Sequence, residues 1–437
     1  MKTIISSTRS YFLTLVVLAS FALSTRAQEV IIPDPGLNAS IRQQLNIIGL
    51  GPLTEQDLLT LTELFANQRN IRQTDGLEAA TNLNFLDLDS NTLTNFALPS
   101  TFTSLTTLDL SFNSLTRCTI TGGLRNLDLI FLEGNELANF TVPEGLTGLA
   151  DLDLGINVLT NITLPADMRN LIRLSLDFNQ LTNLTLPTNL TSLAGLDLDA
   201  NHLSSLKFPA GLRSLSSLSL RGNQLTSLSF PADMTNLNFV DIGQNQLLDL
   251  TMPVPLPHLN FLRLSTNKLT SLVLPAGMTN LEVIFLDGNQ LTNLTLASGL
   301  TNLAQIDLRG NHLASLTLPP DATRLNTLAL DGNPLTTLVL SESMAAGRLA
   351  GLVTSLKDQG VSVFTYPLTV QLNWPRRTAA GAFVFTLTGP PGRYAIQNST
   401  DLLNWSASGA VTNVLGSADF TDSGVSRQKF FRASVVP

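Results

Sequence analysis

One asparagine recurs every 22 residues over more than half of the chain, without a single insertion or deletion. We call these twelve residues the ladder asparagines: Asn91, Asn113, Asn135, Asn157, Asn179, Asn201, Asn223, Asn245, Asn267, Asn289, Asn311 and Asn333. Self-similarity at a fixed spacing of this size predicts a stack of equivalent turns, because each copy is one structural unit that buries its apolar side against its neighbours.

The residues around each ladder asparagine predict a strand and a polar ladder. In "LDLDSN", at residues 86–91, apolar and polar residues alternate, so Leu86 and Leu88 face the core and Asp87 and Asp89 face solvent. The asparagine that ends the strand can both donate and accept hydrogen bonds, and stacking would repeat those bonds from copy to copy. We expect Asn201, in the middle of the array, to contribute more stability than Asn91 near its end.

A second apolar pair closes each copy, as in "LTLP" at residues 184–187, and proline follows that pair in nine of the twelve copies. Proline suits a chain reversal after a short extended segment, because it fixes φ and lacks an N–H. One copy buries too few side chains to offset its backbone entropy, so the array needs many copies and a cap at each end.

The aligned pattern L-x-x-L-x-L-x-x-N-x-L-x-x-L-x-L-P-x-x-L resembles the leucine-rich repeat family. "IPDPGL", "LTEQDL" and "DGLEAATNL", which precede the array, resemble the N-terminal cap of internalin-like bacterial repeat proteins. The resemblance implies a leucine-rich-repeat solenoid, which is a right-handed, β-rich arc whose parallel sheet lines the concave side. From the variable positions of this concave sheet, described below, we expect it to bind a protein or peptide.

Local signals divide the chain into six parts. Asp34 before Pro35, and Thr54 with Asp57, are helix N-cap patterns ahead of the array, and a helical period ending at Gly360 follows it. The predicted parts are a signal peptide (1–27), a helical N-terminal cap (28–60), a degenerate first repeat (61–82), twelve 22-residue repeats (83–340), a helix–strand C-terminal cap (341–367) and a small β-sandwich (368–437).

The N-terminus predicts export. Lys2 and Arg9 precede an apolar run at residues 11–23, and Thr25 and Ala27 fit a cleavage site, so we expect a secreted or cell-envelope-associated protein. The run is too short to span a bilayer. Cleavage would leave 22 basic against 33 acidic residues, a charge near −11, which argues against nucleic acid as a partner.

No pattern of catalytic residues is present in the sequence. His202, His258 and His312 are too far apart along the stack to form one metal site, and the sequence has neither a nucleophile elbow nor a glycine-rich phosphate loop. Cys118, the single cysteine, occupies a leucine position and is expected to be a buried apolar residue. We therefore predict a non-catalytic protein without cofactor or metal.

The variable positions lie six, four and two residues before each ladder asparagine, and all of them face the concave side. Two groups stand out there. The first is an apolar stripe with a charged border, predicted to bind the partner: Phe239, Phe261, Val283, Phe285, Asp241, Arg263, Asp287 and Arg309. The second is an acidic patch, the secondary candidate: Asp151, Asp153, Asp177, Asp197 and Asp199. Large exposed apolar patches on a protein usually bind something.

Each group has a structural alternative. The phenylalanines can serve only cross-strand packing, and the aspartates can serve solubility instead of holding a basic ligand or a calcium ion. At the level of the whole protein, the rival function is a glycan-binding or cell-envelope adhesion protein that makes contact through residues 368–437, with the array as a spacer. Trp374, Tyr394 and Trp405 are candidates for a sugar-stacking platform in that module, although we expect at least two of them to lie in its core.

Overall fold

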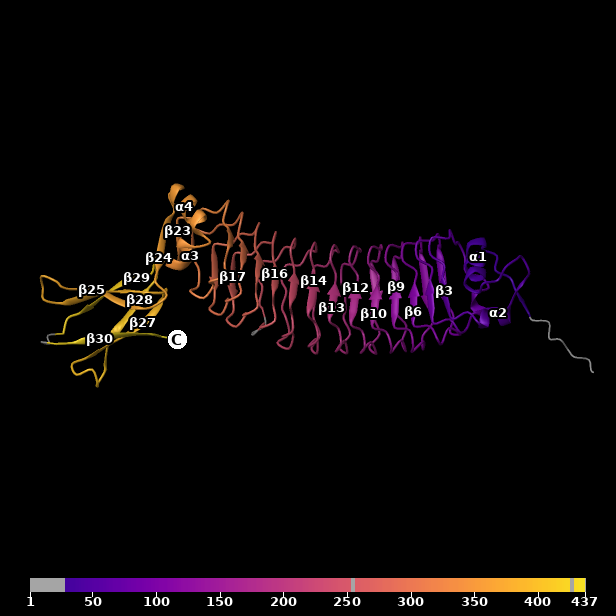
Figure 1. The fold of residues 1–437 in the computed structure, drawn as a ribbon, viewed down its shortest axis with the longest axis horizontal. Helices are drawn as coiled ribbons and strands as arrows, with labels where there is room; N and C mark the ends of the chain where they lie inside the picture. Colours follow the sequence, from indigo (N-terminus) through magenta and orange to yellow (C-terminus); the bar gives the residue numbers. More distant parts are fainter. Residues whose placement is uncertain (1–27, 253–255, 425–427, 437) are drawn as a thin grey trace, which may run out of the picture.

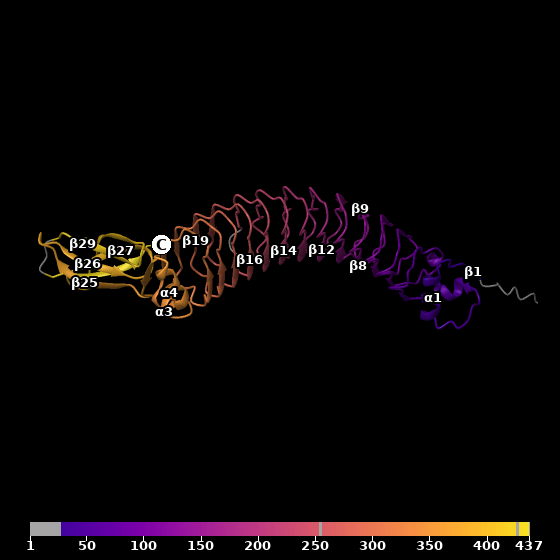
Figure 2. The same cartoon turned by 90° about the horizontal axis from the view of Figure 1, so that it is seen from above.

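A computed structural model describes residues 28–252, 256–424 and 428–436; the predicted signal peptide lies outside this part of the chain. The protein is a long arc of stacked turns with helices at both ends of the stack and a β module beyond the second end (Figure 1). In the perpendicular view, strands such as β8 (Leu129–Phe131) and β12 (Arg173–Ser175) line the inner side of the arc, while β9 (Asn139–Thr141) and β19 (Asn293–Leu296) lie along the outer side (Figure 2).

The inner side of the arc is one sheet of thirteen parallel strands. Each strand pairs in register with the strand 22 residues away, so that Leu152, for example, lies beside Leu174. The strands are β3 (Glu63–Phe65), β4 (Phe85–Asp87), β6 (Thr107–Asp109), β8 (Leu129–Phe131), β10 (Asp151–Asp153), β12 (Arg173–Ser175), β13 (Gly195–Asp197), β14 (Ser217–Ser219), β15 (Phe239–Asp241), β16 (Phe261–Arg263), β18 (Val283–Phe285), β20 (Gln305–Asp307) and β22 (Thr327–Ala329).

The core lies behind this sheet and runs without interruption along the stack. The apolar residues of each L-x-L segment are buried, as Leu196 and Leu198 illustrate, and they form one apolar cluster with those of neighbouring repeats. The degenerate repeat contributes β3, so the sheet begins one strand before β4, the strand of the first ladder repeat.

The ladder asparagines connect successive repeats as the sequence predicts. Asn201 is buried; its Nδ2 donates to the carbonyl of Leu176 at 2.9 Å and to that of Leu198 at 3.2 Å, and its Oδ1 accepts from the N–H of Leu181 at 3.0 Å. The same donor and acceptor roles recur along the array, for example at Asn113 and Asn289. Both functions of the amide are therefore used, which explains why no other residue type occupies these positions.

The outer side of the arc carries short extended segments before the prolines, as predicted. They pair in the small parallel groups β5 (Asn95–Leu98) with β7 (Arg117–Ile120), β9 (Asn139–Thr141) with β11 (Asn161–Thr163), β17 (Ser271–Leu274) with β19 (Asn293–Leu296), and β21 (Ser315–Thr317) with β23 (Thr337–Ser341) and β24 (Ser362–Tyr366). The outer strands thus form several short sheets, whereas the inner sheet is continuous.

Two short helices and a hairpin-like strand pair cover the first end of the core. They are β1 (Glu29–Val30), α1 (Pro35–Gln44), β2 (Leu53–Thr54) and α2 (Glu55–Leu59), and the 3-10 turn η1 (Leu77–Ala79) follows β3. One Asp34 carboxylate oxygen caps α1 at the N–H of Leu37, while the other accepts from the N–H of Arg72 at 2.8 Å and joins the cap to the array. Thr54 and Asp57 form the predicted capping box of α2.

At the other end of the stack, α3 (Glu342–Ala346) and α4 (Ala350–Asp358) cover the core. The continuous helical period expected before Gly360 is therefore interrupted at residues 347–349. Strand β24 then joins the outer sheet, and the Tyr366 hydroxyl donates to the carbonyl of Leu318 at 2.7 Å. Among the described residues, no helix is long and apolar enough to cross a lipid bilayer.

The C-terminal module consists of two three-stranded antiparallel sheets. One contains β25 (Gln371–Arg377), β26 (Phe383–Thr388) and β29 (Ser417–Asp422), and the other contains β27 (Gly392–Ser399), β28 (Ser406–Asn413) and β30 (Phe430–Val435). They enclose a small core of their own that includes Phe385, Tyr394 and Phe420.

Candidate partner-binding site on the concave sheet

The predicted apolar stripe forms one cluster of aromatic side chains. Phe239, Phe261 and Val283 occupy the same position in β15, β16 and β18, so strand register places them side by side. The rings of Phe239 and Phe261 are stacked, with centroids 4.8 Å apart and an interplanar angle of 9°. Phe285 meets Phe261 edge-on at 5.6 Å. We call Phe239, Phe261 and Phe285 the aromatic cluster.

Arg263 covers part of this cluster. Its guanidinium carbon lies 5.4 Å from the ring centroid of Phe261 and 5.0 Å from that of Phe285, within the range of cation–π attraction. Its Nη1 donates to the buried Asp241 carboxylate at 3.1 Å, which fixes the guanidinium over the rings. The three aromatic side chains are half-buried, so the predicted stripe is partly exposed.

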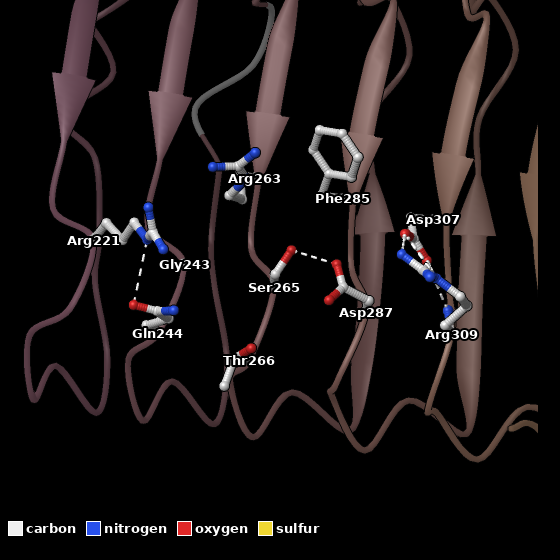
Figure 3. Close-up of a pocket in the computed structure, with 10 residues that line it drawn as sticks. All are labelled: Arg221, Gly243, Gln244, Arg263, Ser265, Thr266, Phe285, Asp287, Asp307 and Arg309. Carbon is white, nitrogen blue, oxygen red and sulfur yellow. Dashed lines mark hydrogen bonds and ion pairs between the residues drawn. The ribbon is translucent and has the colours of Figure 1, made fainter.

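A shallow hollow of about 480 Å³ lies beside the cluster. Its lining residues are Arg221, Gly243, Gln244, Arg263, Ser265, Thr266, Phe285, Asp287, Asp307 and Arg309 (Figure 3). Gly243 contributes to the space, because a Cβ there would lie 3.1 Å from Asp241 Oδ1 and 3.4 Å from Arg263. Four of the eight residues predicted for partner binding, Arg263, Phe285, Asp287 and Arg309, therefore line one hollow.

The charges around the hollow differ in how far they are neutralised. The Arg309 guanidinium donates to both carboxylate oxygens of Asp307. Burial alone would raise the pKa of Asp307, but the hydrogen bonds from Arg309 outweigh burial, so the pKa of Asp307 is lowered. Asp287 accepts from the Ser265 hydroxyl at 2.5 Å. Arg221 donates through Nε to Gln244 at 3.3 Å, and its guanidinium belongs to no ion pair within the described ranges. Arg221 is therefore available to an anionic group.

The sequence-based columns miss two residues of the hollow, Gln244 and Thr266. Both directly precede a ladder asparagine and have left-handed backbone, with φ of 55° and 57°. In Figure 3 they lie beyond the carboxyl ends of the strands, below the predicted columns. A signal for this position exists in the sequence, because glycine occupies it in five of the twelve copies, including Gly222 and Gly288.

The five aspartates of the acidic patch lie on three adjacent strands, β10, β12 and β13, or directly after them. Arg173 lies between Asp151 and Asp153, at 4.0 Å and 3.8 Å. Several of the carboxylates bond to the protein itself: Asp199 Oδ1, for example, accepts from the Ser219 hydroxyl and from the N–H of Arg221. In the part of the chain that is described, no three His, Cys, Asp or Glu side chains gather as metal ligands.

Calcium is expected to leave the stability of the array unchanged. Calcium needs several oxygens at about 2.3–2.6 Å from one point, whereas the patch oxygens of Asp153, Asp197 and Asp199 each accept a backbone N–H. Thermal melts with calcium and with a chelator should therefore coincide. A rise of several degrees in calcium would contradict this expectation.

Asp197 is expected to make the array less stable at pH 8 than at pH 5. Burial raises the pKa of Asp197 to about 6, and repulsion from Asp199 and Asp177 adds to the rise. The folded protein therefore binds this proton more tightly than the unfolded chain, and the resulting stability is lost as the pH rises through about 6. Asp197→Asn should melt a few degrees above the parent at pH 8 and equal it at pH 4; identical curves at both pH values would disprove the effect.

The aromatic residues of the C-terminal module do not form a platform. Tyr394 is buried, Trp374 is 65% exposed, and the Trp405 ring is covered by the Arg432 guanidinium at 4.3 Å from its centroid. The interpretation that at least two of the three lie in the core is therefore wrong, because Trp374 occurs at a bulge with left-handed backbone, φ 49°, that turns it outward.

Cys118 is partly buried, and burial raises the pKa of its thiol to about 12, as expected for an unreactive side chain.

Comparisons with known proteins agree with this geometry. Residues 213–255 match the family described as leucine rich repeats (2 copies), and residues 259–346 match the family described as BspA type leucine rich repeat region (6 copies). No curated protein matches the chain in a sequence search.

Three solved structures illustrate the similarity in fold. The internalin InlF of Listeria monocytogenes is 23% identical, with a TM-score of 0.51 over 71% of this chain and 98% of that one. The functional domain of InlJ from the same species, which includes a cysteine ladder, is 20% identical, with a TM-score of 0.56 over 82% and 94%. YopM of Yersinia pestis, a leucine-rich effector protein, is 22% identical, with a TM-score of 0.53 over 69% and 83%. The chain thus has the leucine-rich-repeat solenoid fold of these structures, and residues 213–255 and 259–346 match leucine-rich-repeat families.

Proposed function

We propose that this protein is a non-catalytic, extracellular or cell-surface binding protein that recognises a protein or peptide through the aromatic cluster and the hollow beside it. The observation that carries the proposal is Arg263 held over Phe261 and Phe285 by Asp241. Aromatic residues and arginine are enriched at the centres of protein interfaces. Because Asp241 holds the group in place before a partner arrives, little conformational entropy would be lost on binding.

The dimensions of the sheet are suitable for this role. Thirteen strands about 4.8 Å apart extend over roughly 58 Å, which accommodates the roughly 800 Å² that each partner contributes to a standard interface. The aromatic cluster lies on β15, β16 and β18, with at least two inner strands on either side that can contribute contacts at the rim.

The hollow also limits the chemistry of the partner. An apolar side chain of the partner would fit against Phe285 and above Gly243. Arg221, whose guanidinium forms no ion pair with any described residue, would bind a carboxylate at one end of the hollow, whereas Arg309 is already paired with Asp307. We therefore propose a partner segment that combines a large apolar residue with an acidic one.

Capture of extracellular proteins on the immobilised chain tests the proposal. Proteins retained by the parent chain are identified, and their affinities for the parent and for variants of the aromatic cluster are then measured by surface plasmon resonance. A partner whose affinity depends on the aromatic cluster would support the proposal. A partner that binds equally to the cluster variants would refute it.

A further inference from the structure

The residue directly before each ladder asparagine has left-handed backbone in all twelve repeats, with φ between 49° and 76°. The cause is a hydrogen bond between repeats: from Ser90 to Gly310, the N–H of this residue donates to the carbonyl two residues before the next ladder asparagine. Left-handed backbone favours glycine and disfavours bulky side chains, β-branched ones above all. Small or polar residues are therefore expected at this position.

Three repeats depart from that expectation with large apolar residues. Phe112, Ile156 and Phe178 have φ of 51°, 50° and 49°. They are 51%, 46% and 58% exposed, so burial does not compensate for the unfavourable backbone. We call these three residues the apolar ridge. Folding alone gives no reason for them, and backbone strain of this kind tends to occur at functional sites.

The apolar ridge is continuous along the edge of the sheet. It occupies the second, fourth and fifth ladder repeats, and the third has Gly134 at the same position. The Phe112 ring leans over Gly134, where a Cβ would come within 2.6 Å of a ring carbon. Val158, which is 38% exposed, lies two residues beyond Ile156. Three repeat spacings of about 4.8 Å give a ridge of roughly 14 Å.

Acidic residues accompany the ridge at each step. The N–H groups of Phe112, Ile156 and Phe178 donate to the carbonyls of Glu133, Asp177 and Asp199, respectively, at 2.7, 2.9 and 2.8 Å. Burial is the main reason why the pKa of Glu133 is raised, and the negative charges of Asp153 and Asp177 raise it further. The concave positions six, four and two residues before Asn135, Asn157, Asn179 and Asn201 contain one basic residue, Arg173.

We infer that the apolar ridge and these acids form a second docking surface, which binds a basic, leucine- or phenylalanine-containing segment of another polypeptide. An extended segment presents side chains of one kind roughly every 6.6–6.8 Å, so two or three apolar side chains match the length of the ridge while lysines or arginines face the acids. The surface lies on repeats separate from the aromatic cluster and does not depend on the function proposed for that cluster.

Fluorescence anisotropy with synthetic nonapeptides tests this inference on the whole chain. The probe alternates lysine and leucine; one control peptide alternates lysine and serine, and a second alternates glutamate and leucine. The key variant is Phe112→Gly with Ile156→Gly and Phe178→Gly, because glycine is the residue that other repeats have at this position. We expect the triple variant to bind the lysine–leucine peptide at least tenfold more weakly than the parent, and to melt no lower than the parent.

Matched substitutions distinguish the possible failures. Ser90→Gly with Ala200→Gly changes the same backbone position in the two repeats that flank the ridge and should leave peptide binding unchanged, as should Phe261→Ala with Phe285→Ala. If the lysine–serine peptide bound as tightly as the lysine–leucine peptide, binding would depend on charge and not on the apolar ridge, and the inference would be overturned. Unchanged binding by the triple variant, a large fall in its melting temperature, or loss of the peptide on changing the aromatic cluster would also overturn it.

Discussion

Replacing Phe261 and Phe285 together with alanine is expected to weaken binding of the protein partner at least tenfold while changing the melting temperature by no more than a few degrees. Central aromatic anchors of interfaces typically contribute about 2 kcal/mol or more each, and loss of Phe285 also removes a ring that Arg263 contacts. Cross-strand packing of these half-buried rings contributes only about 0.2–1 kcal/mol per pair to folding. Surface plasmon resonance and thermal melting measure the two effects separately.

A second aromatic pair on the same sheet provides the control. Phe65 and Phe85, on β3 and β4, have ring centroids 4.9 Å apart, and Phe65 is 48% exposed. Phe65→Ala with Phe85→Ala removes the same atoms at the far end of the sheet and should leave binding intact. If both double variants bind equally well, the aromatic cluster is not the site, and the acidic patch becomes the next candidate. A fall of many degrees in melting would assign the cluster to folding.

Asn201→Ala is expected to destabilise the array more than any single surface substitution. Asn201 is 2% exposed, and its removal leaves the N–H of Leu181 without a partner in the buried interior. It also removes one of the two side-chain bonds to the carbonyl of Leu176, which keeps the bond from Asn179. Each buried backbone group that is left unpaired costs about 1–3 kcal/mol. Urea denaturation followed by circular dichroism should show a clear shift of the midpoint to lower urea.

Asn333→Ala is the matched comparison, because Asn333 makes the same bonds but is only partly buried in the last ladder repeat. Water can replace its lost bonds, so its midpoint should shift less than that of Asn201→Ala. The sequence-based expectation that Asn91 contributes less than Asn201 does not agree with the bonding: Asn91 Oδ1 accepts from both Arg69 and Ile71, since the degenerate repeat supplies a full neighbour. Equal shifts at Asn201 and Asn333 would contradict the role of burial.

The fold could be predicted from the sequence because its main determinants are local and repeated twelve times. The period of two in each L-x-L segment, the donor and acceptor needs of asparagine, and the capping residues Asp34, Thr54 and Asp57 each specify a bond or a burial that the structure contains. The break between α3 and α4 was not predictable in this way. It depends on how residues 347–349 meet the last repeat, which no local period encodes.

The candidate site was predictable only in part. Strand register alone places Phe239 beside Phe261, so the aromatic cluster followed from the 22-residue spacing. The cover provided by Arg263 did not, because Asp241 on the neighbouring strand selects its side-chain orientation. Gln244, Thr266 and the apolar ridge were missed because their outward direction comes from left-handed backbone, whereas the predicted columns assume the alternation of an extended strand.

The invariant length of the repeats has a consequence for how such a protein changes over generations. Every repeat has the same length of 22 residues. Unequal recombination between two copies of the gene, at equivalent positions of two repeats, would therefore add or remove whole turns. Each ladder asparagine would still find an equivalent hydrogen-bond partner in the neighbouring repeat. The distance between the aromatic cluster and the apolar ridge is thereby adjustable in steps of one turn, about 4.8 Å. Descendants could thus acquire differently spaced ligands without having to evolve a new fold.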